Sequence, residues 1–141
     1  MKRAYVKLGW WLLAFIHVGL IWSFSSRSGS EVGLPPPYDK AAHFFSFALL
    51  GFLFAKAFGQ ARLGFLLAAL YGVIDEIHQS FVPLRDASFW DWLADVLGAY
   101  FGAGSAPQAK SVMQTKQATE PPKPRELEQM KEKKKIGITK S

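Results

Sequence analysis

The chain has 141 residues, of which 50% are hydrophobic, 15% aromatic and 20% charged, and its formal net charge is +6. It contains no cysteine, which excludes disulfide bonds, thiol nucleophiles and cysteine-ligated metals. Residues 1–104 hold nearly all the Phe, Trp and Leu, whereas residues 105–141 are rich in Lys, Glu, Gln and Pro. The sequence therefore predicts a single folded domain at 1–104, which is too short for two domains.

The first hydrophobic segment covers residues 8–24 and follows the basic residues Lys2, Arg3 and Lys7. A basic start, an apolar core and small residues at 23–26 are also features of a signal peptide. The segment is nearly long enough to span a bilayer, and tryptophans lie near its ends, as interfacial anchors do. We therefore expect a retained transmembrane helix, with a cleaved signal peptide as the alternative.

Three more hydrophobic helices are expected after a loop at residues 27–39, because the consecutive prolines of that loop cannot continue a helix. The second helix is expected at 41–58 and the third at about 63–81, joined by a link so short that they must form an antiparallel hairpin. The fourth is expected at 89–101. No segment alternates with a period of two residues, so the predicted fold class is all-α, a polytopic membrane protein with about four transmembrane helices.

Two local patterns mark the fourth helix. Ser88 and Asp91 have the spacing of a capping box, in which each side chain bonds the backbone N–H of the other residue. Gly98 and Gly102 have the small-xxx-small spacing that lets two helices approach closely. Together they predict a helix that begins just after Ser88 and packs tightly against a neighbour.

The C-terminal segment, residues 105–141, combines low hydrophobicity with many charges and cannot bury enough apolar surface to offset its conformational entropy. We predict a disordered, basic tail that meets anionic lipid rather than nucleic acid. With four spans, the basic N-terminal flank, the second link and this tail lie on one side, which should be the cytoplasm. Both termini are then cytoplasmic, and the loop at 27–39 is outside.

With this topology, ionisable residues of three helices reach the outer half of the bilayer, where charged groups are costly and usually paired or functional. Asp91 has an alternative explanation as a helix-capping residue. Asp95 lies one turn deeper in the helix, so capping cannot explain it. The competing account of Asp95 is a salt bridge to Arg85 or Lys40. We predict an outward-facing polar pocket lined by Asp39, Lys40, His43, Asp75, Glu76, Gln79, Arg85, Ser88, Asp91 and Asp95.

Histidines raise the question of a metal or a proton carrier at this pocket. His43 and His78 are candidates to join the carboxylates in either role. Their spacing matches no known zinc signature, so no metal is assigned and the cofactor is left open. His17 stands alone in the first helix and is expected to be packed or to face a pore.

Two segments of the chain carry a recognisable pattern. Residues 39–44 read Asp-Lys-Ala-Ala-His-Phe, and residues 71–83 read Tyr-Gly-Val-Ile-Asp-Glu-Ile-His-Gln-Ser-Phe-Val-Pro, followed by Arg-Asp-Ala-Ser at 85–88 and Asp-Trp-Leu-Ala-Asp at 91–95. This pattern resembles the VanZ-like family of bacterial membrane proteins over roughly residues 5–104. That family often has glycine after the proline, where this chain has Leu84, a difference that concerns only the turn.

The resemblance implies a protein of the bacterial cytoplasmic membrane, in a family named for a protein associated with resistance to the glycopeptide teicoplanin. Three functions stay open. In the first, the chain binds a lipid-linked cell-wall component and so affects glycopeptide susceptibility. In the second, it is an enzyme whose carboxylates and His43 act as acid and base, with or without a divalent ion. In the third, it is a structural or assembly protein without turnover. Enzyme side chains must converge around a cavity, whereas structural charges pair off and leave none.

Overall fold

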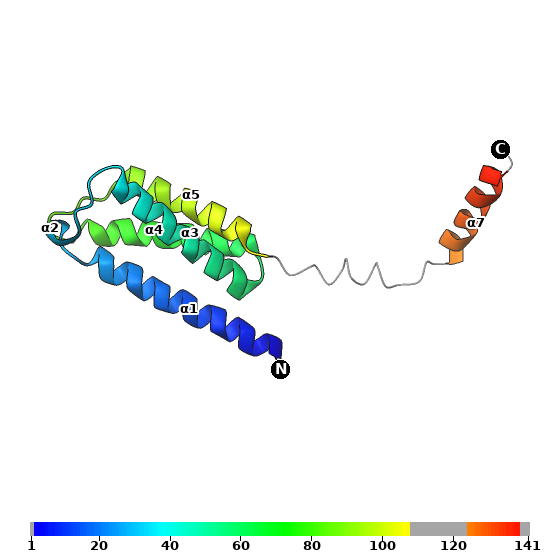
Figure 1. The fold of residues 1–141 in the computed structure, drawn as a ribbon, viewed down its shortest axis with the longest axis horizontal. Helices are drawn as coiled ribbons and strands as arrows, with labels where there is room; N and C mark the ends of the chain where they lie inside the picture. Colours follow the sequence, from blue (N-terminus) through cyan, green and yellow to red (C-terminus); the bar gives the residue numbers. More distant parts are fainter. Residues whose placement is uncertain (1, 108–123, 139–141) are drawn as a thin grey trace. The chain divides into compact units, whose positions relative to one another are not determined.

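The computed structural model describes residues 2–107 and 124–138, which are helical and contain no strand. The all-α prediction is confirmed for these residues. In the N-terminal unit, α3 packs against α4 and α5, and α1 lies along α3, as Figure 1 shows. The elements are α1 Lys2–Ser25, α2 Gly29–Val32, α3 Tyr38–Phe58, α4 Ala61–Gln79, α5 Phe89–Ser105 and α7 Pro124–Ile138.

Among the described residues, two helices are long and apolar enough to cross a membrane, Ala4–Ser25 within α1 and Tyr38–Phe58, which is all of α3. α5 has only 17 residues, and α4 includes Asp75 and Glu76, so neither has the length and uniform composition of an isolated span. Four spans therefore stay a prediction.

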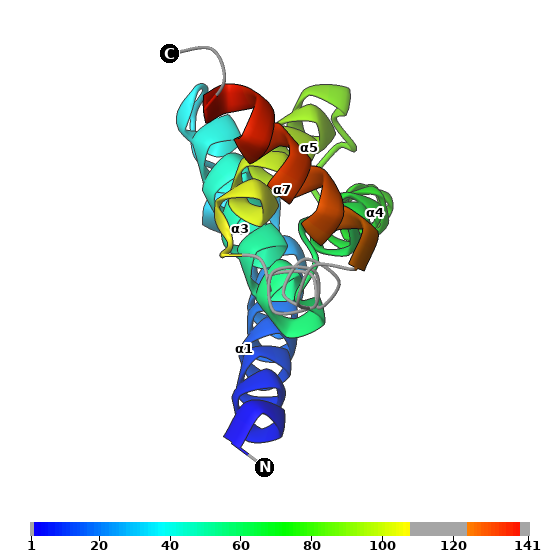
Figure 2. The ribbon, with the colours of Figure 1, turned by 90° about the vertical axis from the view of Figure 1, so that its right-hand side faces the viewer.

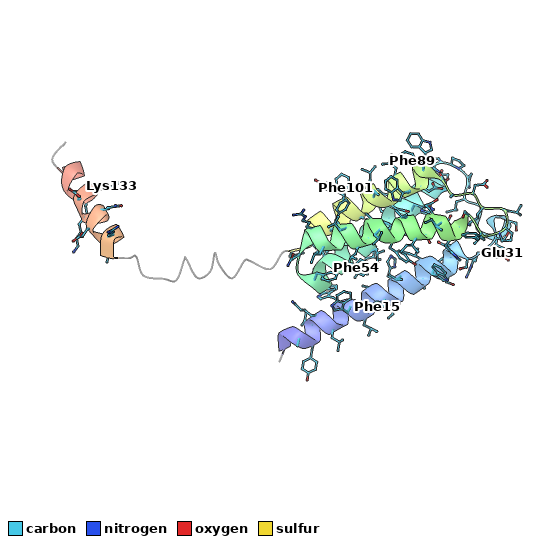
Figure 3. The ribbon with its side chains drawn as sticks, turned by 180° about the vertical axis from the view of Figure 1, so that it is seen from behind. Phe15, Glu31, Phe54, Phe89, Phe101 and Lys133 are labelled. Carbon is cyan, nitrogen blue, oxygen red and sulfur yellow. The ribbon has the colours of Figure 1, made fainter. Side chains whose placement is uncertain are left out.

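The outside of the N-terminal unit is strongly apolar. Phe15 of α1 and Phe89 and Phe101 of α5 are each about 60% exposed, and Figure 3 shows them on the outer faces of these two helices. Leu66, Leu70 and several other large apolar residues of α4 are also exposed. An apolar surface on every helix is what a lipid environment covers, whereas water would penalise it.

α3 and α5 approach closely because small residues lie where they cross. A Cβ on Gly98 would overlap the carbonyl oxygen of Phe44, and a Cβ on Gly102 would overlap that of Ala48. The small-xxx-small prediction therefore holds, with α3 as the partner helix. Figure 2, turned by 90° from Figure 1, gives a second view of these helices.

Gly102→Ala is expected to lower the free energy of unfolding by about 1–3 kcal/mol, because the added methyl group forces two backbones apart. Gly104→Ala is the matched control, since a Cβ there meets nothing within 4 Å. The control should be neutral or slightly stabilising, as alanine favours helix. Thermal unfolding in detergent measures both, and equal melting temperatures for the two variants would contradict the close contact.

The turn between α4 and α5 confirms half of the predicted capping box. Ser88 Oγ accepts the Asp91 N–H at 3.3 Å, as predicted, and α5 begins at the next residue. The Ser88 N–H does not bond Asp91; it donates to Glu76 Oε2 at 2.7 Å. The sequence missed this because Glu76 belongs to another helix.

Leu84, which stands where the family often has glycine, has a φ of 59°, in the left-handed region that glycine adopts most easily.

The C-terminal unit corrects the prediction of a disordered tail at 105–141. The first of these residues, Ser105, still belongs to α5, and Pro124–Ile138 form the helix α7. Its described side chains, including Glu128 and Lys131, are exposed. Lys, Glu, Gln and Leu are strong helix formers, and an acidic residue three positions before a basic one adds support, so α7 needs no core. Residues 108–123 and 139–141 lie outside the described residues.

Candidate functional site

A cavity of about 600 Å³ lies at the end of the bundle where α1 and α4 finish and α3 and α5 begin. Its apolar wall comes mainly from Leu20, Ile21 and Phe24 of α1. Most of the residues predicted for the pocket line the polar wall, namely Asp39, His43, Asp75, Gln79, Arg85 and Asp91. The sequence did not identify three further polar residues of this wall, which are Ser25, Ser46 and Asp86.

The other predicted residues lie behind this wall and contact the residues that form it. Lys40 is within ion-pair distance of Asp39 and Asp91. Ser88 and Glu76 line a second, mainly apolar hollow of about 320 Å³ on the other side of α4. Asp95 does not line the cavity, but it contacts His43, which does.

His43 and Asp95 form a buried pair. His43 Nδ1 lies 2.9 Å from Asp95 Oδ1, and the Asp95 side chain is fully buried. The competing account, a salt bridge from Asp95 to Arg85 or Lys40, does not hold, because Lys40 pairs with Asp39 and Asp91 and Arg85 bonds Gln79. Asp95 faces the first turns of α3, where Gly72 of α4 leaves room for it, since a Cβ there would lie 3.1 Å from the Asp95 Cβ. The carboxylate orients the imidazole at the cavity wall.

Glu76 joins this pair from the third helix. Its side chain is 9% exposed, and Oε1 lies 4.0 Å from His43 Nδ1. One ligand atom from each of His43, Glu76 and Asp95 lies within 4.8 Å of the others. Imidazole nitrogen and carboxylate oxygen are ligands that divalent metals use, so these residues have the chemistry to hold an ion. Sequence spacing missed this group because each member comes from a different helix.

A chain of hydrogen bonds connects Arg85 to Asp75. Arg85 Nη1 donates to Gln79 Oε1 at 2.9 Å, and Gln79 Nε2 donates to Asp75 Oδ2 at 2.9 Å. Arg85 has no ion pair with an acidic residue of the described part. Its guanidinium therefore gives the cavity wall a positive charge that an anionic ligand can use.

Lys40 pairs with two aspartates at the rim of the cavity. Its Nζ lies 2.8 Å from Asp39 Oδ2 and 2.5 Å from Asp91 Oδ1. Asp91 therefore serves an ion pair between α3 and α5, and not the reciprocal half of the capping box. One lysine shared by two aspartates compensates only one of the two carboxylate charges at this rim.

The remaining histidines differ in their surroundings. His17 Nε2 donates to the Ser46 carbonyl oxygen at 2.9 Å, so this histidine links α1 to α3 and also lines the cavity. His78 stacks on Trp22 with ring centroids 3.8 Å apart, and its Nε2 lies 2.9 Å from Ser26 Oγ. His78, one of two candidate histidines for the carboxylate cluster, therefore lies apart from it.

Comparison with known proteins gives the family of the chain. No curated protein and no solved structure matches it significantly. One family model, described as VanZ/LLP1, matches residues 3–110, which include α1 except its first residue, α2 to α5 and every residue of the predicted pocket. This match confirms the resemblance seen in the sequence, and the chain belongs to the VanZ/LLP1 family.

Proposed function

We propose that this protein binds a lipid-linked component of the bacterial cell envelope and holds its polar head group in the 600 Å³ cavity. The observation that carries the proposal is the mixed wall of that cavity. Leu20, Ile21 and Phe24 offer apolar contact on one side, while His43 and Arg85 offer polar contact on the other. Ligand sites commonly have this volume and combine apolar walls with a few polar groups.

The exposed apolar surfaces of α4 and α5 support a four-span arrangement in the cytoplasmic membrane. With cytoplasmic termini, the end of the bundle that holds the cavity faces outward, where lipid-linked cell-wall precursors are used. The basic C-terminal segment then lies beside the anionic inner leaflet. Binding of such a precursor would change how much of it a glycopeptide such as teicoplanin can reach.

Unpaired acids argue against a purely structural role. Asp75 Oδ1, Glu76 Oε1 and Asp95 Oδ2 are buried and have no hydrogen-bond partner among the described residues. Charges that serve only to set helix register would each be paired, and no cavity would adjoin them.

A second candidate is an enzyme that acts on the same head group, and the His43–Asp95 pair favours it. Asp95 holds the imidazole, as carboxylates do for catalytic histidines, so His43 has the surroundings of a general base at the cavity wall.

Arg85→Gln is expected to weaken binding of a lipid-linked peptidoglycan precursor by about ten-fold or more, because it removes a charge-assisted contact to an anionic head group. Native mass spectrometry of the purified protein, with phosphatidylglycerol as competitor, measures this. Arg62→Gln makes the same change in the first turn of α4, and this variant should bind the precursor like the wild type. If the precursor binds no better than phosphatidylglycerol, or if both variants bind equally, the proposal is wrong.

A further inference from the structure

Three side chains from α3, α4 and α5 meet behind the cavity wall. We propose that His43, Glu76 and Asp95 bind a divalent metal ion, with one ligand atom from each residue. These atoms lie within 4.8 Å of one another. His43 Nδ1 and Asp95 Oδ1 are 2.9 Å apart, which suits neighbouring ligands of one ion with bonds of about 2.0–2.2 Å.

The carboxylates of this cluster have oxygens without a donor. As whole residues, Glu76 is 6% exposed and Asp95 is fully buried. Glu76 Oε1 and Asp95 Oδ2 have no hydrogen-bond partner among the described residues. Buried carboxylate oxygens are costly unless hydrogen bonds or a cation compensate them, so these atoms point to a missing positive charge.

Neighbouring side chains do not supply that charge. Lys40 pairs with Asp39 and Asp91, and Arg85 bonds Gln79. His43 contributes at most one positive charge, against two carboxylates. A divalent ion balances both carboxylates and leaves His43 as the neutral imidazole that metals bind.

The residues around the cluster hold the ligands in place. The Ser88 N–H donates to Glu76 Oε2, which leaves Oε1 as the oxygen nearer His43. Gly72 leaves the space that Asp95 occupies, because a Cβ there would lie 3.2 Å from Asp95 Oδ2. Such outer contacts orient metal ligands in known sites and raise their affinity.

One nitrogen and two oxygen ligands suit Zn²⁺ or Mn²⁺, whereas Ca²⁺ prefers a larger set of oxygens. Three protein ligands leave a coordination position open, as in catalytic metal sites. Since His43 also lines the cavity, the ion would adjoin the proposed head-group site. The inference goes beyond the proposed function, because ion binding needs no lipid.

Equilibrium dialysis tests the site on the full-length protein in detergent, stripped with a chelator and then exposed to Zn²⁺ or Mn²⁺ alone. We expect one ion per wild-type chain. Glu76→Gln and Asp95→Asn should weaken the affinity by at least about ten-fold, since even outer-shell changes have effects of that size. Glu31→Gln is the matched control on the exposed helix α2 and should bind like the wild type.

A measurement on the wild type alone covers the case in which a variant fails to fold. Electron spin-echo spectra of bound Mn²⁺ should show coupling to a histidine ¹⁴N. The metal site would be overturned if the wild type bound no ion or if bound Mn²⁺ showed no nitrogen coupling. It would also be overturned if folded variants bound the ion with the same affinity as the wild type. Lipid binding measured in chelator separates the two proposals: precursor binding without ion binding removes only the metal, and ion binding without precursor binding removes only the proposed function.

Discussion

Asp95→Asn is expected to accumulate in the membrane like the wild type and, under the proposed function, to lose any effect that the wild-type chain has on teicoplanin susceptibility. Asparagine keeps the shape of the side chain and an oxygen that accepts the His43 N–H, so the fold has little reason to fail. The substitution removes the negative charge, which would either stabilise a protonated His43 or ligate the proposed metal ion. Losing a positioned acid–base group typically costs about 10²–10⁴-fold in rate.

Asp95→Ala separates the charge from the packing. Alanine leaves the His43 N–H without an acceptor and opens a void beside Gly72, so stability should fall by about 1–3 kcal/mol. Asp91→Asn is the comparison at a partly exposed position, where Lys40 keeps Asp39 as a partner, and it should cost less than about 1 kcal/mol. Membrane abundance, melting temperature in detergent and teicoplanin susceptibility are measured together. A stable Asp95→Asn variant with a normal phenotype would remove Asp95 from the site.

Single cysteines at Ser30 and Ala87 are expected to react fully with an impermeant thiol reagent in intact cells, and one at Gln129 not at all. The chain has no cysteine of its own, so the background is empty. Ala87 distinguishes four spans from two, because its loop is outside only if α4 and α5 both cross the membrane. The Gly29 N–H donates to the Pro83 carbonyl oxygen at 3.2 Å, which joins the α2 segment to the α4–α5 turn and favours a common side.

Other labelling patterns have definite meanings. Labelling of Ser30 but not Ala87 would leave α1 and α3 as the two spans. Labelling of Gln129 alone would invert the protein and put the cavity at the cytoplasmic face. Labelling after permeabilisation shows that each cysteine is reactive once reached.

The sequence by itself determined the helices, because hydrophobic runs, prolines and caps act within a few residues. The long apolar runs predicted α1 and α3, Ser88 predicted the start of α5, and the glycines of α5 predicted its close packing. The motifs around His43 and Asp95 were enough to indicate the family. Hydrophobicity does not predict α7, because a segment too polar to bury a core can still have high local helix propensity.

Only the tertiary structure decided which polar residues meet. A helical repeat of about 100° per residue groups residues on one face but does not identify the helix opposite that face. In the sequence, Lys40 and Arg85 are the plausible partners of Asp95, and its distance of 52 positions from His43 gives no reason to choose His43. His43 and His78 looked alike for the same reason, yet α4 turns His78 towards Trp22 while α3 directs His43 to the carboxylates. The contacts that bring His43, Glu76 and Asp95 together cross between helices, and such contacts depend on how the helices pack.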